Sequence, residues 1–203
     1  MKPVLILDCD EVILHFVLPF ADWLRDRHDI ELRFESFSLL DNMRHGTGEQ
    51  VTKQQFYALL DRFFVEGPDL QPPVEQALET LERLSATLDL VVLTNIPARF
   101  LAIRKARLMA LGLCCPVHSN EGPKGRMVRQ LAHGRLAVFV DDLPSHLESA
   151  ARLAPEVGRL HMVAEPAFRA LVPEAPEAHA RVGGWAEAGR WIEAYFERTK
   201  HGR

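Results

Sequence analysis

Cysteine is scarce in this sequence, and its placement excludes most of the uses that proteins make of it. Only three cysteines occur among 203 residues, and two of them, Cys114 and Cys115, are adjacent. Three thiols cannot all pair, adjacent cysteines seldom form a structural disulfide, and no Cys-x-x-Cys or Cys/His spacing typical of a zinc site is present. We therefore expect reduced thiols and a cytoplasmic location.

Long apolar runs and a large excess of one charge are missing as well. The apolar run after Lys2 is too short for a secretory signal, and no run approaches the roughly eighteen residues of a membrane helix. A net charge of −4 gives no reason to expect nucleic acid or an acidic membrane as a partner. The composition, 47% hydrophobic and 26% charged, is typical of one globular domain or one domain with a modest insertion.

The first ten residues contain the clearest local signal in the chain. Residues 4–7 are four consecutive apolar residues, a pattern typical of a strand buried on both faces of a parallel sheet. Asp8, Cys9 and Asp10 follow, and carboxylates at i and i+2 of an extended chain project to the same side. Two like charges so close together favour a neutralising cation such as Mg²⁺. The alternative is a strand that simply ends in a polar turn.

The rest of the chain alternates between buried-strand patterns and amphipathic helices. Helical spacing of apolar residues precedes or follows each run, and 165–182 has no clear pattern. This alternation predicts an α/β fold, with a parallel, Rossmann-like sheet and helices on both of its faces. The predicted strands are 4–7, 90–93, 113–118, 136–140 and 159–163.

Residues 14–70, called the insert below, are predicted to form a small Phe-rich helical unit. An apolar stripe begins at Phe16 and repeats at helical spacing, and a second stripe spans 56–64. Gly and Pro residues then mark a linker. We therefore divide the chain into a core, 1–13 and 71–203, and a helical cap formed by the insert.

Polar residues follow the predicted strands at one edge of the sheet. In parallel sheets, ligands bind beyond the carboxyl ends of the strands, so these side chains should form one site. A lysine and a threonine beside clustered acids suit a phosphoryl group, whereas no Ser-His-Asp or Cys-His arrangement supports acyl transfer. An Asp can attack phosphorus, and a second Asp can act as general acid and base. The residues are Asp8, Asp10, Thr94, Lys124, Asp141 and Asp142.

Four segments resemble, in order, the motifs of the haloacid dehalogenase (HAD) superfamily of phosphohydrolases. They are Leu-Ile-Leu-Asp8-Cys-Asp10, Val-Val-Leu-Thr94-Asn95, Gly-Pro-Lys124-Gly and Val-Phe-Val-Asp141-Asp142. The resemblance implies a Mg²⁺-dependent phosphatase that hydrolyses a small phosphorylated metabolite through an aspartyl-phosphate. The insert resembles a helical cap between the first and second motifs, and is loosely similar to that of the deoxyribonucleotidase branch.

The resemblance also implies a role for each residue of the first and last motifs. Asp8 would be the nucleophile and a Mg²⁺ ligand. Asp10 would be the general acid and base and would offer the metal its backbone carbonyl. An acid at position 10 favours ester hydrolysis over dehalogenation. Asp141 and Asp142 would complete the metal site, with Asp142 as the direct ligand.

The two middle motifs would hold the phosphoryl group. Thr94, with the amide of Asn95, would bind the phosphoryl oxygens, and Lys124 would neutralise the phosphate and anchor Asp8. Many relatives have Gly where Glu11 stands, so this carboxylate either adds negative charge to the site or points outward.

Two other functional classes and one surface feature complete the expectations. A phospho-acceptor signalling module uses a similar set of residues, but in another order along the chain, and a binding protein could keep the fold without turnover. Cys9 is expected to pack in the core. The basic helix with Arg99, Arg104, Lys105 and Arg107 is expected to present an exposed face, with Arg99 alone near the catalytic edge.

Overall fold

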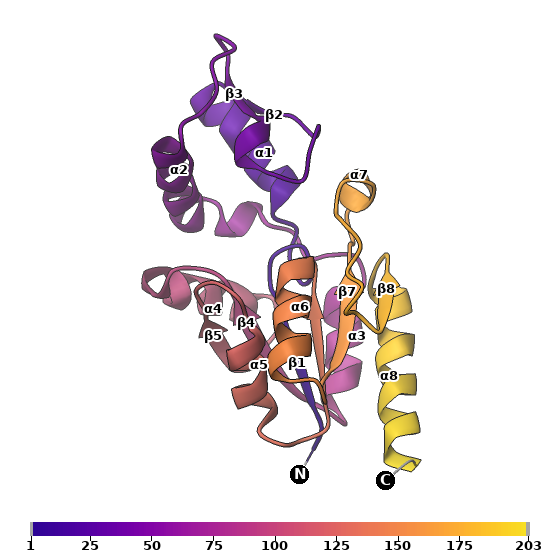
Figure 1. The fold of residues 1–203 in the computed structure, drawn as a ribbon. Helices are drawn as coiled ribbons and strands as arrows, with labels where there is room; N and C mark the ends of the chain where they lie inside the picture. Colours follow the sequence, from indigo (N-terminus) through magenta and orange to yellow (C-terminus); the bar gives the residue numbers. More distant parts are fainter. Residues whose placement is uncertain (1, 202–203) are drawn as a thin grey trace.

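A six-stranded parallel sheet forms the centre of the molecule in a computed structural model that describes residues 2–201 (Figure 1). All five strand pairs of this sheet are parallel. In spatial order the strands are β5 (Val117–Ser119), β4 (Asp89–Thr94), β1 (Val4–Leu7), β6 (Ala137–Asp141), β7 (Gly158–Met162) and β8 (Ala180–Val182).

Alternate residues of β1 bury against opposite layers of helices. Leu5 and Leu7 belong to the cluster on one face, and Val4 and Ile6 to the cluster on the other. The first face is covered by α3 (Ala77–Ser85), α4 (Leu101–Ala110) and α8 (Trp185–His201), and the second by α5 (Gly125–Ala132) and α6 (Pro144–Leu153). Burial on both faces explains why the strand is uniformly apolar, and it confirms the predicted fold class.

The insert lies beyond one end of the sheet and has its own hydrophobic cluster (Figure 1). The rings of Phe16, Phe20 and Phe63 contact one another within this cluster, with centroids 5.1 to 5.5 Å apart. A Thr52 capping box begins its second helix. The insert contains α1 (Val17–His28), β2 (Ile30–Leu32), a 3₁₀ turn (Leu40–Asn42), β3 (Met43–His45), α2 (Lys53–Glu66) and a second 3₁₀ turn (Pro68–Leu70).

Four short elements lie where the sequence showed no pattern. β2 and β3 pair as an antiparallel hairpin inside the insert, which is therefore not purely helical. Strand β8 and the four-residue helix α7 (Pro166–Arg169) lie within 165–182. Strands of three residues are too short to display a period of two, so side-chain pattern alone cannot reveal them.

The order of the strands places the ends of three of them side by side. β1 lies between β4 and β6, with Leu7 opposite both Val92 and Val140. After β1 the sheet is extended in one direction by β4 and β5 and in the other by β6 to β8. Such a reversal of strand order leaves a crevice at the carboxyl ends of the strands, which is where Asp8 lies.

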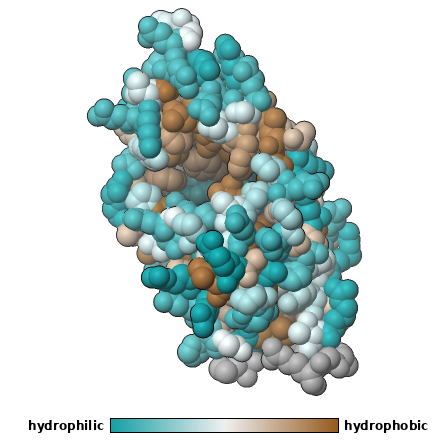
Figure 2. All heavy atoms as spheres, viewed as in Figure 1, coloured by the Kyte–Doolittle hydropathy of each residue, from teal (hydrophilic) through white to brown (hydrophobic). Residues whose placement is uncertain are grey.

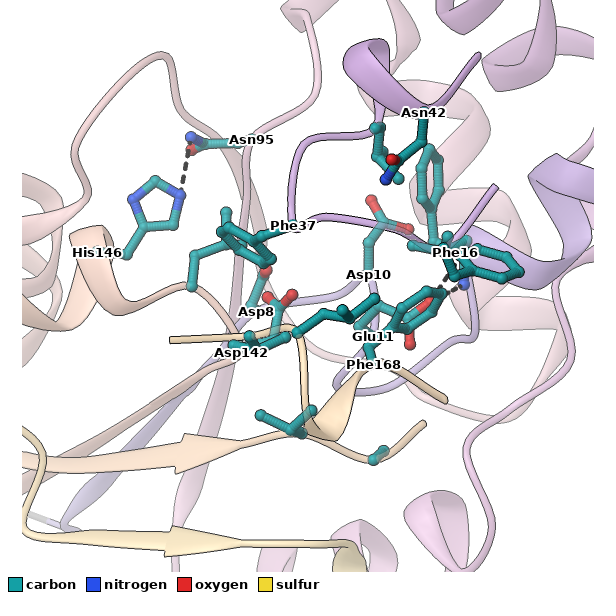
Figure 3. Close-up of a pocket in the computed structure, with 18 of the residues that line it drawn as sticks. Asp8, Asp10, Glu11, Phe16, Phe37, Asn42, Asn95, Asp142, His146 and Phe168 are labelled. Carbon is teal, nitrogen blue, oxygen red and sulfur yellow. Dashed lines mark hydrogen bonds between the residues drawn. The ribbon is translucent and has the colours of Figure 1, made fainter. Parts of the chain in front are cut away.

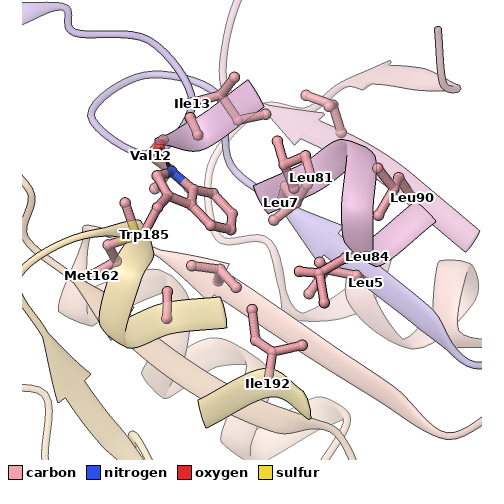
Figure 4. Packing of buried hydrophobic residues seen from close by; sticks show 14 of the residues in the cluster. Leu5, Leu7, Val12, Ile13, Leu81, Leu84, Leu90, Met162, Trp185 and Ile192 are labelled. Atoms are coloured by element: carbon pink, nitrogen blue, oxygen red, sulfur yellow. Dashed lines mark hydrogen bonds between the residues drawn. The ribbon is translucent and has the colours of Figure 1, made fainter. Parts of the chain in front are cut away.

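A buried hydrogen bond fixes the loop after β1 to the last helix of the core. The indole Nε1 of Trp185 donates to the carbonyl of Val12 at 2.7 Å, and Ile13 and Met162 lie near this contact (Figure 4). This hydrogen bond therefore anchors the loop that bears Asp10 to helix α8 of the core. No helix within residues 2–201 is long and apolar enough to cross a membrane.

Candidate active site

Asp8 and Asp141 share one buried lysine. The Nζ atom of Lys124 lies 2.7 Å from Oδ1 of Asp8 and 2.8 Å from Oδ2 of Asp141, and the Lys124 side chain is 0% exposed. Burial alone would lower the pKa of Lys124, but the two carboxylates outweigh it and hold that pKa above its ordinary value. The ammonium group therefore stays charged and links the ends of β1 and β6.

Lys124 reaches this position because a glycine follows it. A Cβ atom on Gly125 would meet the backbone oxygen of Ser149 at 2.1 Å, so only glycine lets the first turn of α5 approach α6 this closely. The Gly125 amide also donates to the Ser149 hydroxyl at 3.1 Å. The motif Gly-Pro-Lys-Gly thus aims the lysine by packing one helix against another.

Within the described part of the chain, Asp142 is the one acidic residue of the cluster that forms no ion pair. Carboxylate oxygens of Asp8, Asp141 and Asp142 lie within 4.8 Å of one another. The Asp141 carboxylate accepts hydrogen bonds from Lys124 and from the backbone amide of Leu143. Burial, with the charges of Asp141 and Asp8, raises the pKa of Asp142 well above its usual range. The group that would relieve this repulsion is a divalent cation, so the cluster fits a metal ion with oxygen ligands.

Thr94 ends β4 beside this cluster with its hydroxyl unused. The residue is fully buried, and its Oγ1 has no hydrogen-bond partner among residues 2–201. Asn95 follows Thr94, and its Nδ2 atom lies 3.3 Å from Nε2 of His146. This contact is drawn as a dashed line in Figure 3. Burial lowers the pKa of His146, which favours its neutral form. An unpartnered buried hydroxyl at a strand end is a donor available to a ligand oxygen.

Asp10 is held by residues that the sequence analysis did not assign to the site. Nη2 of Arg104 lies 2.9 Å from Oδ1 of Asp10 and donates to Oδ2 at 3.1 Å. Gln71, where the insert rejoins the core, donates to the same carboxylate at 3.0 Å. Burial raises the pKa of Asp10, and Arg104 opposes that rise. Asp8 and Asp10 are therefore neutralised by different cations.

The prediction for the basic helix was wrong about Arg104. Its side chain is only 5% exposed and runs through the core to Asp10 and to the thiol of Cys9. Arg107 is also mostly buried, with its side chain 17% exposed, and donates to the Gln71 carbonyl. Arg99, expected to be the only one of the four near the catalytic edge, forms an ion pair with Asp61 of the insert, and Lys105 is exposed as predicted. Cys9 is buried as expected, and burial raises its thiol pKa to about 12, which favours the protonated thiol over the reactive thiolate.

Glu11 does not point outward: it lines the cavity, and its charge contributes to the raised pKa of Asp142. The Glu11 carboxylate accepts hydrogen bonds from the amides of Phe16 and Val17 at 2.8 and 2.7 Å, which caps the start of α1. The backbone of Glu11 has a φ of 59°. Left-handed backbone favours glycine and costs other residues roughly 1–2 kcal/mol, which the two capping bonds offset.

A cavity of about 420 Å³ separates the insert from the strand ends. Figure 3 shows Asp8 and Asp142 side by side on its floor, with Phe16, Phe37 and Phe168 nearby. Hydrophobic surface is visible within this hollow in Figure 2. Of the predicted site residues, Asp8, Asp10, Asn95 and Asp142 line this cavity, with Asp10 turned toward the insert. Lys124 and Asp141 are buried beside Asp8, and Thr94 ends the adjacent strand β4.

Comparison with known proteins finds similarity in structure and none in sequence. Neither a scan against models of protein families nor a search of the curated proteins finds a match. Among solved structures, a haloacid dehalogenase-like hydrolase from Streptococcus pneumoniae superimposes with a TM-score of 0.66 at 11% identity, covering 94% of this chain and 98% of that one.

Two further structures extend this similarity. A phosphonoacetaldehyde hydrolase-like protein from Oleispira antarctica gives a TM-score of 0.66 at 14% identity, over 100% of this chain and 95% of its own. A HAD family hydrolase from Deinococcus radiodurans, solved with bound phosphate and sodium, gives 0.63 at 15% identity, over 96% of both chains. The resemblance to the HAD superfamily is thus confirmed at the level of the fold. The link to the deoxyribonucleotidase branch stays a prediction.

Proposed function

On this HAD fold, we propose that the protein is a Mg²⁺-dependent phosphatase that hydrolyses the monoester of a small phosphorylated metabolite. One observation supports it above all: the carboxylates of Asp8, Asp141 and Asp142 converge with Lys124. The neighbouring strand β4 ends in Thr94, whose buried hydroxyl has no partner among the described residues. A phosphoryl group needs this combination of nucleophile, cations and donors. The insert is proposed to be the cap that covers the reaction.

The metal would be held by Asp8 and Asp142 through their side chains and by Asp10 through its backbone carbonyl. Asp141 would support the site from its position beside Lys124. When bound, Mg²⁺ neutralises the phosphoryl oxygens and fixes their orientation for in-line attack. The raised pKa of Asp142 reflects the negative charge that such a cation would balance.

The first half of the proposed reaction transfers the phosphoryl group to Asp8. A carboxylate oxygen of Asp8 forms a bond to phosphorus as the bond from phosphorus to the ester oxygen breaks. Asp10, in its protonated form, gives its proton to the departing oxygen, so that the product leaves as a neutral alcohol. Lys124 holds the other Asp8 oxygen, and Thr94 donates to a phosphoryl oxygen.

The second half regenerates the enzyme. Asp10, now a carboxylate, takes a proton from a water molecule whose oxygen attacks phosphorus. The bond between phosphorus and Asp8 breaks, inorganic phosphate leaves, and both aspartates return to their starting forms. Arg104 and Gln71 keep the Asp10 side chain in place through both halves.

Replacing the nucleophile tests this proposal directly. We expect Asp8→Asn to reduce hydrolysis of 4-nitrophenyl phosphate by at least about a thousandfold while the protein stays folded. Asp26→Asn is the matched control, because Asp26 is an exposed aspartate of α1 that pairs with Arg25. Retained activity in Asp8→Asn would refute the role of Asp8. An acid-quenched wild-type reaction should contain phosphate on the peptide bearing Asp8, and a lifetime of minutes for that adduct would favour a signalling switch instead.

A further inference from the structure

The cavity above Asp8 is walled mainly by aromatic and aliphatic side chains. Five phenylalanines line it, namely Phe16, Phe34, Phe37, Phe64 and Phe168. They come from two sides, because four belong to the insert and Phe168 belongs to α7 of the core. The rings of Phe34 and Phe168 meet edge to face at 5.0 Å and close one wall.

The polar groups at the insert end of the cavity already satisfy each other. The hydroxyl of Ser36 donates to Oδ1 of Asn42 at 3.2 Å, and Nδ2 of Asn42 donates to the Ser36 carbonyl at 2.7 Å. A ligand with many hydroxyl groups would find few free partners there. Burying such groups without hydrogen bonds is costly, so this wall disfavours a sugar.

The charge of the cavity is also one-sided. Among the described residues that line it, none is Lys or Arg, whereas Asp8, Asp10, Glu11 and Asp142 are acidic. Lys124 is buried beneath the floor between Asp8 and Asp141. A second phosphate or a carboxylate on the substrate would face this acidic rim without a cation to pair with.

We propose that the Phe-lined cavity is the leaving-group pocket and that it selects phosphate esters of uncharged, aromatic or arylalkyl alcohols. This inference rests on the proposed function, because it takes Asp8 as the point of phosphoryl transfer. The phosphate binds between Asp8 and Thr94, and the alcohol extends between Phe37 and Phe168 toward the insert. Phe37 is 43% exposed, so a bound ring would cover apolar surface that is otherwise in water.

Esters of primary alcohols test this specificity without differences in leaving-group chemistry. We expect kcat/KM for 2-phenylethyl phosphate to exceed that for ethyl phosphate by about 30-fold or more, the gain from burying one ring. Glucose 6-phosphate, 2-phosphoglycolate and thymidine 5′-monophosphate should each fall well below 2-phenylethyl phosphate. If any of these three exceeded it, or if ethyl phosphate equalled it, the inference would be wrong while the phosphatase proposal stood.

A variant pair locates the preference in the pocket. Phe37→Ala should lower kcat/KM for 2-phenylethyl phosphate about tenfold and leave that for ethyl phosphate unchanged. Tyr57→Ala is the control, because Tyr57 is an exposed aromatic residue of the same insert that lies outside the cavity. If Phe37→Ala changed the oligomeric state but not the ratio of the two substrates, the phenylalanines would belong to a protein contact and the pocket assignment would fail.

Failure of the proposed function can be told apart from failure of the pocket. If no ester is hydrolysed, the phosphatase proposal is refuted. The pocket is then tested by isothermal titration calorimetry, in which each of two non-hydrolysable probes is titrated into the protein in the presence of Mg²⁺. Tighter binding of 2-phenylethylphosphonate than of methylphosphonate, lost in Phe37→Ala, would support the apolar pocket. Equal or absent binding of both would overturn it.

Discussion

The proposed catalytic edge of the core, at the carboxyl ends of β1 and β6, and the insert beyond it are built on opposite principles. At the edge, charged groups are buried in fixed pairs, as when Lys124 joins Asp8 to Asp141. In the insert, a cluster of phenylalanine and tryptophan rings supports an apolar cavity wall with partly exposed residues such as Phe37. The ion pairs at the strand ends tolerate little displacement, because each depends on a short distance between two charged atoms. The apolar contacts of the insert tolerate much more, because apolar contact is not directional.

This contrast teaches which half of the molecule sets each property. In the proposed function, charge and distance at the strand ends determine the reaction, and ring packing in the insert determines which alcohol fits. Changes at the edge should therefore abolish turnover for every substrate, whereas changes in the insert should alter stability or the order of preference among substrates.

Removal of the metal should cause the largest loss of activity. We expect excess EDTA to reduce hydrolysis of 4-nitrophenyl phosphate at least about a thousandfold, since metal ions supply several kcal/mol of charge stabilisation. Added Mg²⁺ should restore the rate. Turnover that persists in EDTA would contradict the argument from the Asp8, Asp141 and Asp142 cluster.

A core substitution in the insert should separate the two regions. Phe63→Ala removes a fully buried ring from the insert cluster and should cost about 3–5 kcal/mol. Because that cluster is distinct from those of the sheet, limited proteolysis should cut within 16–66 while the core stays intact. Phe139→Ala, in the sheet, is the comparison, and this variant should be cleaved in both the insert and the core. Cleavage spread over the whole chain in Phe63→Ala would show that the insert and the core unfold as one unit.

Arg104 should affect turnover through Asp10 without contacting the substrate. Arg104→Lys keeps a positive charge but loses the geometry that holds Asp10, and we expect kcat to fall about 10- to 100-fold. Inhibition by inorganic phosphate should change little, because Arg104 does not line the cavity. Lys105→Met, on the exposed face of the same helix, should leave both values unchanged. Equal losses in kcat and in phosphate binding would indicate general damage to the fold instead.

The smallest effect concerns the stability of the metal-free protein. Burial, with the neighbouring acids, raises the pKa of Asp142 well above 3.8, so the folded state binds this proton more tightly than the unfolded state does. Stability is therefore lost as the pH rises through that folded-state pKa. In EDTA at pH 8 we expect Asp142→Asn to melt about 2–4 °C above the wild type, and the gap to shrink toward pH 4. Mg²⁺ should raise the melting temperature of the wild type alone, and a lower melting temperature for the variant would refute the argument.

The edge was largely predictable from the sequence because its signals are local. An apolar strand followed by acids marks Asp8 and Asp141, and parallel topology then brings strand ends together wherever they lie in the chain. Arg104 and Gln71 have no such signal. Arg104 is a charged residue on an amphipathic helix, and only the tertiary structure shows that it points inward to Asp10. Gln71 lies among prolines in a linker, where its amide has no expected partner.

The insert was predictable in outline and not in its functional detail. The stripes that begin at Phe16 and span 56–64 correspond to α1 and α2. The loop containing Phe34 and Phe37 has no period, and its contact with Phe168 joins parts of the chain more than 130 residues apart. Cavity walls made by such distant loops depend on how the two regions dock, which no local pattern encodes.

The hydrogen bond from Trp185 to Val12 also bears on how the protein is made. It spans 173 positions of the chain and fixes the loop that presents Asp10. During synthesis, Val12 leaves the ribosome long before Trp185 is translated, so the growing chain exposes its acidic loop without this anchor for most of the time that translation takes. The newly made protein can acquire its finished geometry only after α8 has docked, and any chain that stops short of that helix lacks this link altogether.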